Sequence, residues 1–156
     1  MREKLEEKVG KFLKRKKLTI AVAESCTGGL VLKRLTDVSG SSSYVKMGMV
    51  LYSNDAKDEF LKIPKKAIEK VGAVSGPVAH QMAKNVKKIA GTDFGVGITG
   101  IAGPSGGSKE KPVGLVFMSV VGPKDSITEY RIFKGTRSSI RNKAANYVFS
   151  LLLMII

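Results

Sequence analysis

Hydroxyl, thiol, amide and carboxylate side chains gather in four short segments of the sequence, where we expect the chemistry to lie. The segments are Glu24–Gly29, Tyr52–Asn54, Thr99–Pro104 and Ser39–Ser43. Each of the first three follows a short apolar run that is typical of a buried strand. Ligands of open α/β sheets bind beyond the carboxyl ends of the strands, so we expect the four segments to supply one site at that edge.

A serine nucleophile needs a base, and this chain offers few candidates for that role. His80 is the single histidine and stands between apolar residues on a predicted helix, so we interpret it as a surface or partly buried helix residue. Lys57 is the better base, because Asn54–Lys57 places it in the first turn of a predicted helix at the strand edge. An ammonium group is disfavoured there, which lowers the pKa of the lysine. The competing interpretation of Lys57 is an exposed lysine in a lysine-rich chain.

The turn Thr27-Gly28-Gly29 opens a predicted helix directly after a strand. Free backbone N–H groups at such a helix start can bind an anion or an oxyanion. Alternatively, the glycines serve only to permit a tight turn. Neither a Walker-type phosphate loop nor a Gly-x-Gly-x-x-Gly motif follows the strand, so hydrolysis of nucleoside triphosphates is not supported. We interpret the neighbouring Cys26 as a small packed residue rather than a thiolate nucleophile.

Two residue types are too rare for several common classes of site. Cys26 is the only cysteine and His80 the only histidine. This excludes a disulfide framework, a zinc ribbon and any site that needs two imidazoles. The acidic residues form no spaced carboxylate set for magnesium or for a two-metal centre. We therefore expect a site without metal or cofactor.

The chain is strongly basic, with 27 Lys and Arg against 13 Asp and Glu in 156 residues and a formal net charge of +14. A positive net charge of this size attracts nucleic acid, an anionic membrane surface or a phosphorylated small molecule. Lys11–Lys17 holds five positive charges, which we interpret as a solvated helix face. Nucleic acid is the less favoured partner, because Phe12 is the only aromatic residue among these lysines.

Apolar runs are short throughout the chain, the longest being Leu151–Ile156. A membrane-spanning helix needs about 20 such residues, and the first residues also lack the apolar core of a signal peptide. We therefore expect a cytoplasmic protein without a membrane partner. The continuous apolar tail favours burial in a subunit contact of a homo-oligomer over a fully internal last helical turn.

Strands and helices alternate along the chain, which predicts a single domain over residues 1–156 with a three-layer α/β/α sandwich. The short turn 122–126 makes the last two strands antiparallel, so we expect a mixed, mostly parallel sheet. The expected strands are 18–23, 44–52, 94–99, 113–121 and 127–133. The expected helices are 3–16, one carrying Val31 and Leu35, one carrying Lys57, 64–71, one starting at Ser75-Gly76-Pro77, and one from Arg137 to the terminus.

Six ordered motifs resemble those of the CinA C-terminal domain family, over nearly the whole chain. Together, at family-like spacing, they are far more specific than any one of them. The motifs are Ala23–Gly29, Leu35–Asp37 with Gly40–Ser42, Tyr52–Asn54 with Ala56 and Lys57, Gly72–Ser75, Gly97–Pro104 with Gly106 and Gly107, and Glu110–Gly114. Phe133–Arg137 is similar to the family's Phe-Pro-Gly-Asp-Arg and departs from it at Lys134 and Thr136.

The resemblance implies a function, because stand-alone members of the family include nicotinamide mononucleotide deamidases. These hydrolases release ammonia from the carboxamide and form nicotinate mononucleotide, a reaction of pyridine nucleotide salvage in NAD metabolism. The resemblance also implies the three-layer fold and an active site that uses serine and lysine without metal. Carried over motif by motif, the site residues are Ser25, Ser42, Tyr52, Lys57, Thr99 and Arg137.

The chemistry of these residues leads to a concrete hypothesis. Ser42 attacks the carboxamide carbon, with Lys57 as base and Tyr52 assisting. Backbone N–H groups from Ser25 to Gly28 hold the oxyanion. Ser25 is the competing nucleophile, because it stands on the sharper strand-to-helix turn.

Substrate binding is expected from five positions. Arg137, at the start of the last helix, should meet the phosphate of the mononucleotide. Thr99 and Gly100 should contact the ribose or the carboxamide, and Thr27 and Gly28 belong to the anion-binding turn. The alternative functions are a nucleic-acid-binding module related to competence or damage, and a nucleotide-binding module without catalysis.

Overall fold

The computed structural model describes residues 2–156 and contains five strands, six α-helices and one short 3-10 helix, η1 (Ser41–Ser43). The strands are β1 (Ile20–Glu24), β2 (Val45–Val50), β3 (Phe94–Gly100), β4 (Leu115–Val121) and β5 (Ser126–Ile132). The helices are α1 (Leu5–Lys16), α2 (Leu30–Thr36), α3 (Asn54–Leu61), α4 (Lys65–Val71), α5 (Gly76–Ala90) and α6 (Arg137–Ile155). These elements match the expected ones to within a few residues at each end.

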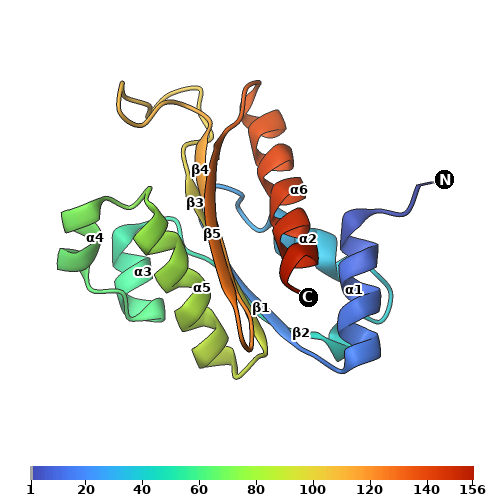
Figure 1. The fold of residues 1–156 in the computed structure, drawn as a ribbon. Coiled ribbons are helices and arrows are strands. Elements are labelled where there is room, and N and C mark those ends of the chain that lie inside the picture. The colour runs from blue at the N-terminus through green and yellow to red at the C-terminus, as the bar shows by residue number, and fades with distance from the viewer. Residues whose placement is uncertain (1) are drawn as a thin grey trace.

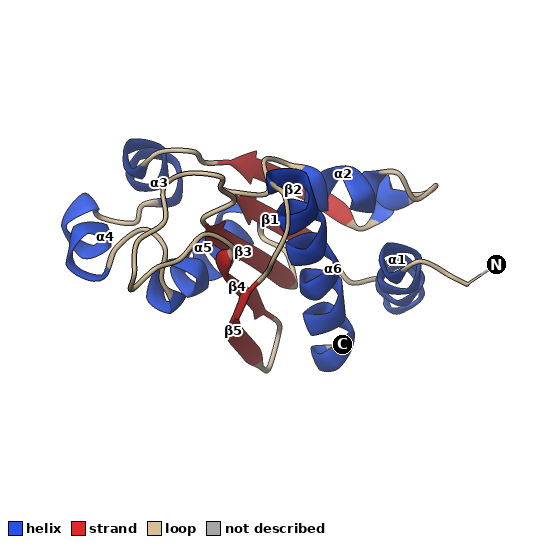
Figure 2. Cartoon of the chain, turned by 90° about the horizontal axis from the view of Figure 1, so that it is seen from above, coloured by secondary structure: helices blue, strands red, loops and turns tan. Residues whose placement is uncertain are grey.

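One sheet of order β2-β1-β3-β4-β5 lies between two layers of helices (Figures 1 and 2). Helices α1, α2 and α6 lie on one side of it, and α3, α4 and α5 lie on the other (Figure 1). β1 is parallel to both β2 and β3, whereas β4 is antiparallel to β3 and to β5. Four of the five strands therefore run in the same direction, which confirms the expected mixed sandwich.

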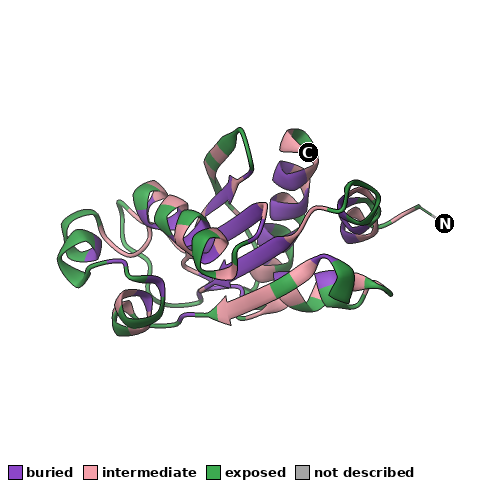
Figure 3. Ribbon diagram, turned by 90° about the horizontal axis from the view of Figure 1, so that it is seen from below, coloured by how far each residue is buried: buried purple, intermediate pink, exposed green. Residues whose placement is uncertain are grey.

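The central strand β1 separates two hydrophobic cores. All five of its residues are buried, as the purple strands at the centre of Figure 3 illustrate. Ile20 and Val22 belong to the core beneath α1, α2 and α6, and the alternate residues Ala21 and Ala23 belong to the core beneath α3, α4 and α5. This alternation follows from the two-residue period of a strand, and burial on both faces explains the uninterrupted apolar run.

Glycines in β3 allow α5 to approach the sheet closely. A Cβ atom at Gly97 would lie 2.2 Å from the Ala79 carbonyl oxygen, and one at Gly95 would lie 2.1 Å from the Ala83 carbonyl oxygen. Both distances are far inside van der Waals contact, so any side chain here would push the helix away. The glycines thus let α5 pack directly against the strand that ends at the candidate site.

Hydroxyl caps begin three of the helices. Ser53 Oγ accepts a hydrogen bond from the Ala56 N–H, and Ser75 Oγ accepts one from the Val78 N–H, so α3 and α5 start where the sequence predicts. Thr136 Oγ1 accepts from the Ser139 N–H at the start of α6. Thr136, which departs from the family's aspartate, therefore still provides a helix cap beside Arg137.

The apolar tail packs mainly against its own chain. Leu151 and Leu152 are fully buried in the core, and Ile155 and Ile156 pack partly against it. Met154 is 65% exposed. Internal packing thus accounts for Leu151 and Leu152, whereas a subunit contact of the remaining tail residues stays a prediction. A homo-oligomer remains a prediction.

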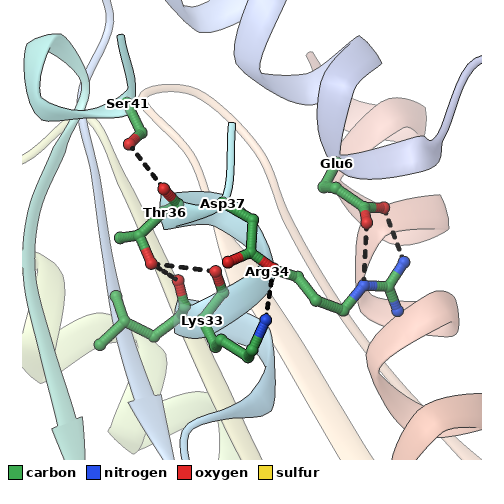
Figure 4. A network of polar contacts seen from close by, with 7 residues as sticks. Glu6, Lys33, Arg34, Thr36, Asp37 and Ser41 are labelled. Atoms are coloured by element: carbon green, nitrogen blue, oxygen red, sulfur yellow. Dashed lines mark hydrogen bonds and ion pairs between the residues drawn. The ribbon is translucent and has the colours of Figure 1, made fainter. Parts of the chain in front are cut away.

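A polar cluster anchors α1 to α2 and α6. Figure 4 shows the Arg34 guanidinium pointing at the Glu6 carboxylate, with N–O distances of 3.2 and 2.6 Å. Arg34 also donates to the Asn146 side chain at 2.7 Å and stacks over the Phe149 ring, 4.7 Å from its centroid. The forked guanidinium therefore ties together three helices that surround one core.

Candidate active site

Ser25 and Lys57 meet at the carboxyl edge of the sheet. Ser25 directly follows β1, and its N–H donates to the Ile98 carbonyl of β3 at 3.0 Å. Lys57 lies in the first half of α3, which begins after β2. Its Nζ atom lies 3.5 Å from Ser25 Oγ and donates to the Leu51 carbonyl at 3.1 Å. The arrangement places a hydroxyl nucleophile beside an amine.

Lys57 is buried, which makes it unlike the exposed lysines of the chain. Its exposed fraction is 3%, and none of the ion pairs among residues 2–156 includes it. Burial disfavours the ammonium form and lowers the pKa of Lys57, and the coulombic influence of Cys26 opposes this shift only in part. A lysine with a lowered pKa has more of the neutral amine that can accept a proton from serine.

Ser42 lies at the other edge of the sheet, so the expected pairing of Ser42 with Lys57 is not formed within one chain. Ser42 belongs to η1, which comes before β2, whereas Lys57 comes after this strand. β2, a six-residue strand about 17 Å long, lies between the two positions in the chain. Ser42 is exposed, and its carbonyl accepts from Lys46 Nζ. Ser25 is the serine that the fold brings to Lys57.

The start of α2 is already occupied by a carboxylate, which sequence reasoning missed. Glu24 is 1% exposed, and its carboxylate accepts hydrogen bonds from the N–H groups of Gly29, Val31 and Leu32 at 3.1, 3.2 and 2.8 Å. Of the N–H groups that the Thr27-Gly28-Gly29 turn was expected to offer to a ligand, that of Gly29 is therefore bound by Glu24. The signal was a lone glutamate at the end of an apolar run, a few residues before a helix without a Ser, Thr, Asp or Asn cap.

Two other N–H groups of the turn are not engaged in hydrogen bonds among residues 2–156. The Gly28 N–H donates to the Ser25 carbonyl at 3.0 Å, whereas those of Cys26 and Thr27 have no acceptor among residues 2–156. Of the expected oxyanion donors, only the N–H groups of Cys26 and Thr27 are therefore unpaired in the described part of the chain. Both residues are buried, with exposed fractions of 5% for Cys26 and 0% for Thr27. Burial, with the charge of Glu24, raises the pKa of the Cys26 thiol to about 12, so Cys26 is a packed thiol as expected.

Tyr52 and Arg137 form a second polar contact at the same edge. One guanidinium nitrogen of Arg137 donates to Tyr52 Oη at 2.8 Å, and another donates to the Gly103 carbonyl at 2.6 Å. Both side chains are exposed, and Arg137 makes no ion pair with the residues that the structure describes. A positive charge that only neutral oxygens contact is suited to an anionic ligand.

Thr99 is buried and Gly100 is partly exposed at the end of β3. Thr99 is 1% exposed, and its hydroxyl donates to the Ala73 carbonyl at 2.8 Å. Gly100 packs against β4, and a Cβ atom there would lie 2.7 Å from the Leu115 carbonyl oxygen. In this conformation Thr99 holds the 72–75 segment, and its hydroxyl is turned to the Ala73 carbonyl and not to an open site.

Within residues 2–156, no group of three His, Cys, Asp or Glu side chains is arranged to hold a metal ion. The same part of the chain has no helix that is both long and apolar enough to cross a membrane.

Sequence comparison relates this chain to larger bacterial proteins. A "Putative competence-damage inducible protein" of Thermoanaerobacter sp. (strain X514) is 49% identical over 141 residues, 90% of this chain and 34% of that protein. A "CinA-like protein" of Chlorobium limicola is 54% identical over 120 residues, 77% of this chain and 28% of that protein. The chain spans about a third of the length of the curated relatives that it matches.

Solved structures share the fold over almost its full extent. A CinA superfamily protein from Escherichia coli superposes with a TM-score of 0.93 at 28% identity, covering 97% of this chain and 88% of that one. The competence/damage inducible protein CihA from Agrobacterium tumefaciens superposes with a TM-score of 0.90 at 34% identity. This match covers 99% of this chain and 97% of that one. The family model described as "CinA C-terminal domain" matches residues 2–156. The chain therefore belongs to the CinA C-terminal domain family.

Proposed function

We propose that this chain is an amidohydrolase that converts nicotinamide mononucleotide to nicotinate mononucleotide and ammonia, with Ser25 as nucleophile and Lys57 as base. The observation that carries the proposal is the 3.5 Å contact between Ser25 Oγ and the buried Lys57 Nζ. Family membership supports the choice of reaction, because stand-alone members resembling this chain include deamidases of this nucleotide. Ser25 replaces Ser42 as the favoured nucleophile.

The first half of the reaction forms an acyl-enzyme. Neutral Lys57 takes the proton of Ser25 Oγ while this oxygen bonds to the carboxamide carbon. The N–H groups of Cys26 and Thr27 then donate to the tetrahedral oxyanion. As the intermediate collapses, the C–N bond breaks and protonated Lys57 returns the proton to the leaving nitrogen, which departs as ammonia.

The second half releases nicotinate mononucleotide. Lys57 removes a proton from water, whose oxygen attacks the acyl carbon at the same oxyanion position. The Ser25 Oγ–C bond breaks, and Ser25 recovers its proton from Lys57. Each lysine protonation is reversed within the cycle, so no group outside the site has to store a proton.

Arg137 is the proposed phosphate ligand. It is exposed, it carries no ion pair within residues 2–156, and it stands on the edge that holds Ser25 and Lys57. Tyr52 accepts from one nitrogen of the guanidinium and so orients it. Guanidinium groups recognise phosphate through paired hydrogen bonds, which supports a phosphorylated substrate.

The test is turnover of nicotinamide mononucleotide by the purified protein, with ammonia and nicotinate mononucleotide measured together. We expect equal amounts of both products, and a loss of at least about 10³-fold in Lys57→Ala. Lys66→Ala is the matched control, because Lys66 is an exposed lysine of α4. No turnover by folded wild-type protein, or equal turnover by Lys57→Ala, would contradict the proposal.

A nucleic-acid-binding function is the second candidate, and one observation favours it. The side chains of Lys11 and Lys14–Lys17 are all exposed on α1 and just after it, next to exposed Lys8. A basic surface of this kind binds phosphate backbones without sequence preference. Titration with a fluorescent oligonucleotide tests it, because such binding falls steeply between about 50 and about 200 mM salt. Absence of binding at about 50 mM salt would remove this candidate.

A further inference from the structure

We propose that Arg141 is a positioning residue, which holds the turn from Ser25 to Gly28 in the shape that presents the nucleophile and its oxyanion donors. The inference rests on the proposed function insofar as Ser25 is the nucleophile. Arg141 lies on α6, one helical turn after Arg137. Neither the sequence motifs nor the expected site residues pointed to it.

The contact joins the turn to a helix that is distant in the sequence. Arg141 Nη2 donates to the Thr27 carbonyl at 2.9 Å, across 114 residues of chain. The same carbonyl accepts from the Leu30 N–H at 3.1 Å. The Thr27 carbonyl is thereby fixed by two donors, one at the start of α2 and one on α6.

The turn and the guanidinium are closely fitted to each other. Gly28 has a φ of +60°, and a Cβ atom at this position would lie 2.6 Å from Arg141 Nη2. Residue 28 must therefore lack a side chain both for its backbone conformation and for the approach of Arg141. The glycine, assigned at first to anion binding, leaves room for the arginine.

The guanidinium faces the turn and is only partly hydrogen-bonded. Arg141 Nε and Thr27 Oγ1 are both buried, and neither has a hydrogen-bond partner among the described residues. Arg141 makes no ion pair in that part of the chain. Its uncompensated charge reaches the turn, because it opposes the rise in the pKa of the Cys26 thiol that burial and Glu24 cause.

Two consequences for the reaction follow from this placement. Fixing the Thr27 carbonyl sets the turn that directs the N–H groups of Cys26 and Thr27, so the oxyanion donors need not reorganise during reaction. A positive charge behind the turn also favours negative charge on Ser25 Oγ and on the oxyanion. Loss of Arg141 should therefore slow bond formation at Ser25.

The experiment measures the reactivity of Ser25 without relying on the natural substrate. A fluorophosphonate probe is added to the protein, and its covalent attachment is followed by intact mass. Ser25 Oγ forms a bond to phosphorus, fluoride leaves, and Lys57 takes the serine proton. Ser25→Ala identifies the labelled position. Turnover of nicotinamide mononucleotide is measured on the same samples, so an error in the proposed substrate is seen separately from an error about Arg141.

We expect the probe to label Arg141→Ala about 10- to 100-fold more slowly than wild type. Arg141→Lys should give an intermediate rate, because lysine keeps the positive charge but lacks the forked donors of the guanidinium. Arg34→Ala is the matched control, since Arg34 is another partly buried arginine that holds helices together and contacts Glu6 rather than the turn. It should lower the Tm and leave the labelling rate within about twofold of wild type. Equal slowing in Arg34→Ala, wild-type rates in both Arg141 variants, or no labelling of Ser25 in wild type would overturn the inference.

Discussion

Ser25 Oγ and Lys57 Nζ lie 3.5 Å apart although their residues are 32 positions apart in the chain. The contact arises because β1 and β2 are parallel neighbours whose ends are paired, Glu24 beside Val50. The Leu51 N–H donates to the Glu24 carbonyl at 2.8 Å, so the segments after both strands begin side by side. α3 then carries Lys57 back over the edge. Sheet topology, rather than any local motif, creates the pair.

The pH dependence of kcat should report the titration of Lys57. Burial lowers the pKa of Lys57 below the ordinary lysine value of 10.5. The neutral amine is the base, so its fraction and kcat should rise with pH and level off above a midpoint that lies below 10.5. A pH–rate profile checks this. A rate that falls over the same range would contradict the assigned role, because it would require the ammonium form to be active.

Arg137→Ala should raise KM for nicotinamide mononucleotide by about 10- to 100-fold and change kcat far less. The physical reason is loss of a charged donor to the phosphate, a group remote from the reacting carbon. Steady-state kinetics on the mononucleotide and on nicotinamide riboside, which lacks the phosphate, give the comparison. The KM effect should vanish with the riboside, and a loss confined to kcat would speak against phosphate binding.

Much of the architecture was predictable from local patterns, because the spacing of apolar residues and the identity of helix caps can be read within a few residues of each element. Ser53 and Ser75 mark the starts of α3 and α5, and the all-apolar β1 indicates a strand that is buried on both faces. Lys57 was identified as a base because it lies in the first turn of a predicted helix, where an ammonium group is disfavoured and the pKa of the amine is lowered.

The sequence left the site incomplete where the answer depends on tertiary arrangement. The motifs predict that Ser42 pairs with Lys57, whereas the structure places the two residues before and after β2, at opposite edges of the sheet within one chain. The role of Glu24 as a cap depends on how its carboxylate turns back onto α2. Arg141 was missed because its contact crosses 114 residues, although its spacing of four from Arg137 placed both on one helix face.

Glu24→Gln should destabilise the protein, because a carboxylate that accepts three backbone N–H bonds is replaced by an amide with one acceptor oxygen. A loss of about 1–3 kcal/mol in the free energy of unfolding is expected, measured by denaturant titration. Glu59→Gln, which changes an exposed glutamate of α3, is the control and should stay within about 0.5 kcal/mol of wild type. Equal stability of both variants would remove the capping role of Glu24.

The contact between Glu6 and Arg34 should make stability depend on acid pH. Burial raises the pKa of Glu6, but the hydrogen bonds and the charge of Arg34 outweigh it, so the net pKa lies below the ordinary 4.5. The contribution of the charged pair is therefore fully present above about pH 4.5 and is lost as pH falls through the lower pKa of the folded state. The Tm difference between wild type and Glu6→Gln should shrink over that window. A constant difference would mean that packing, not the charge, is responsible.

The central claim is that Ser25 is the nucleophile of a serine and lysine amidohydrolase, and one comparison tests it most directly. Formation of nicotinate mononucleotide from nicotinamide mononucleotide is measured for wild type, Ser25→Ala and Ser42→Ala, with folding checked by Tm. We predict loss of at least about 10³-fold in Ser25→Ala and near wild-type turnover in Ser42→Ala. Full activity of Ser25→Ala together with an inactive Ser42→Ala would contradict the claim.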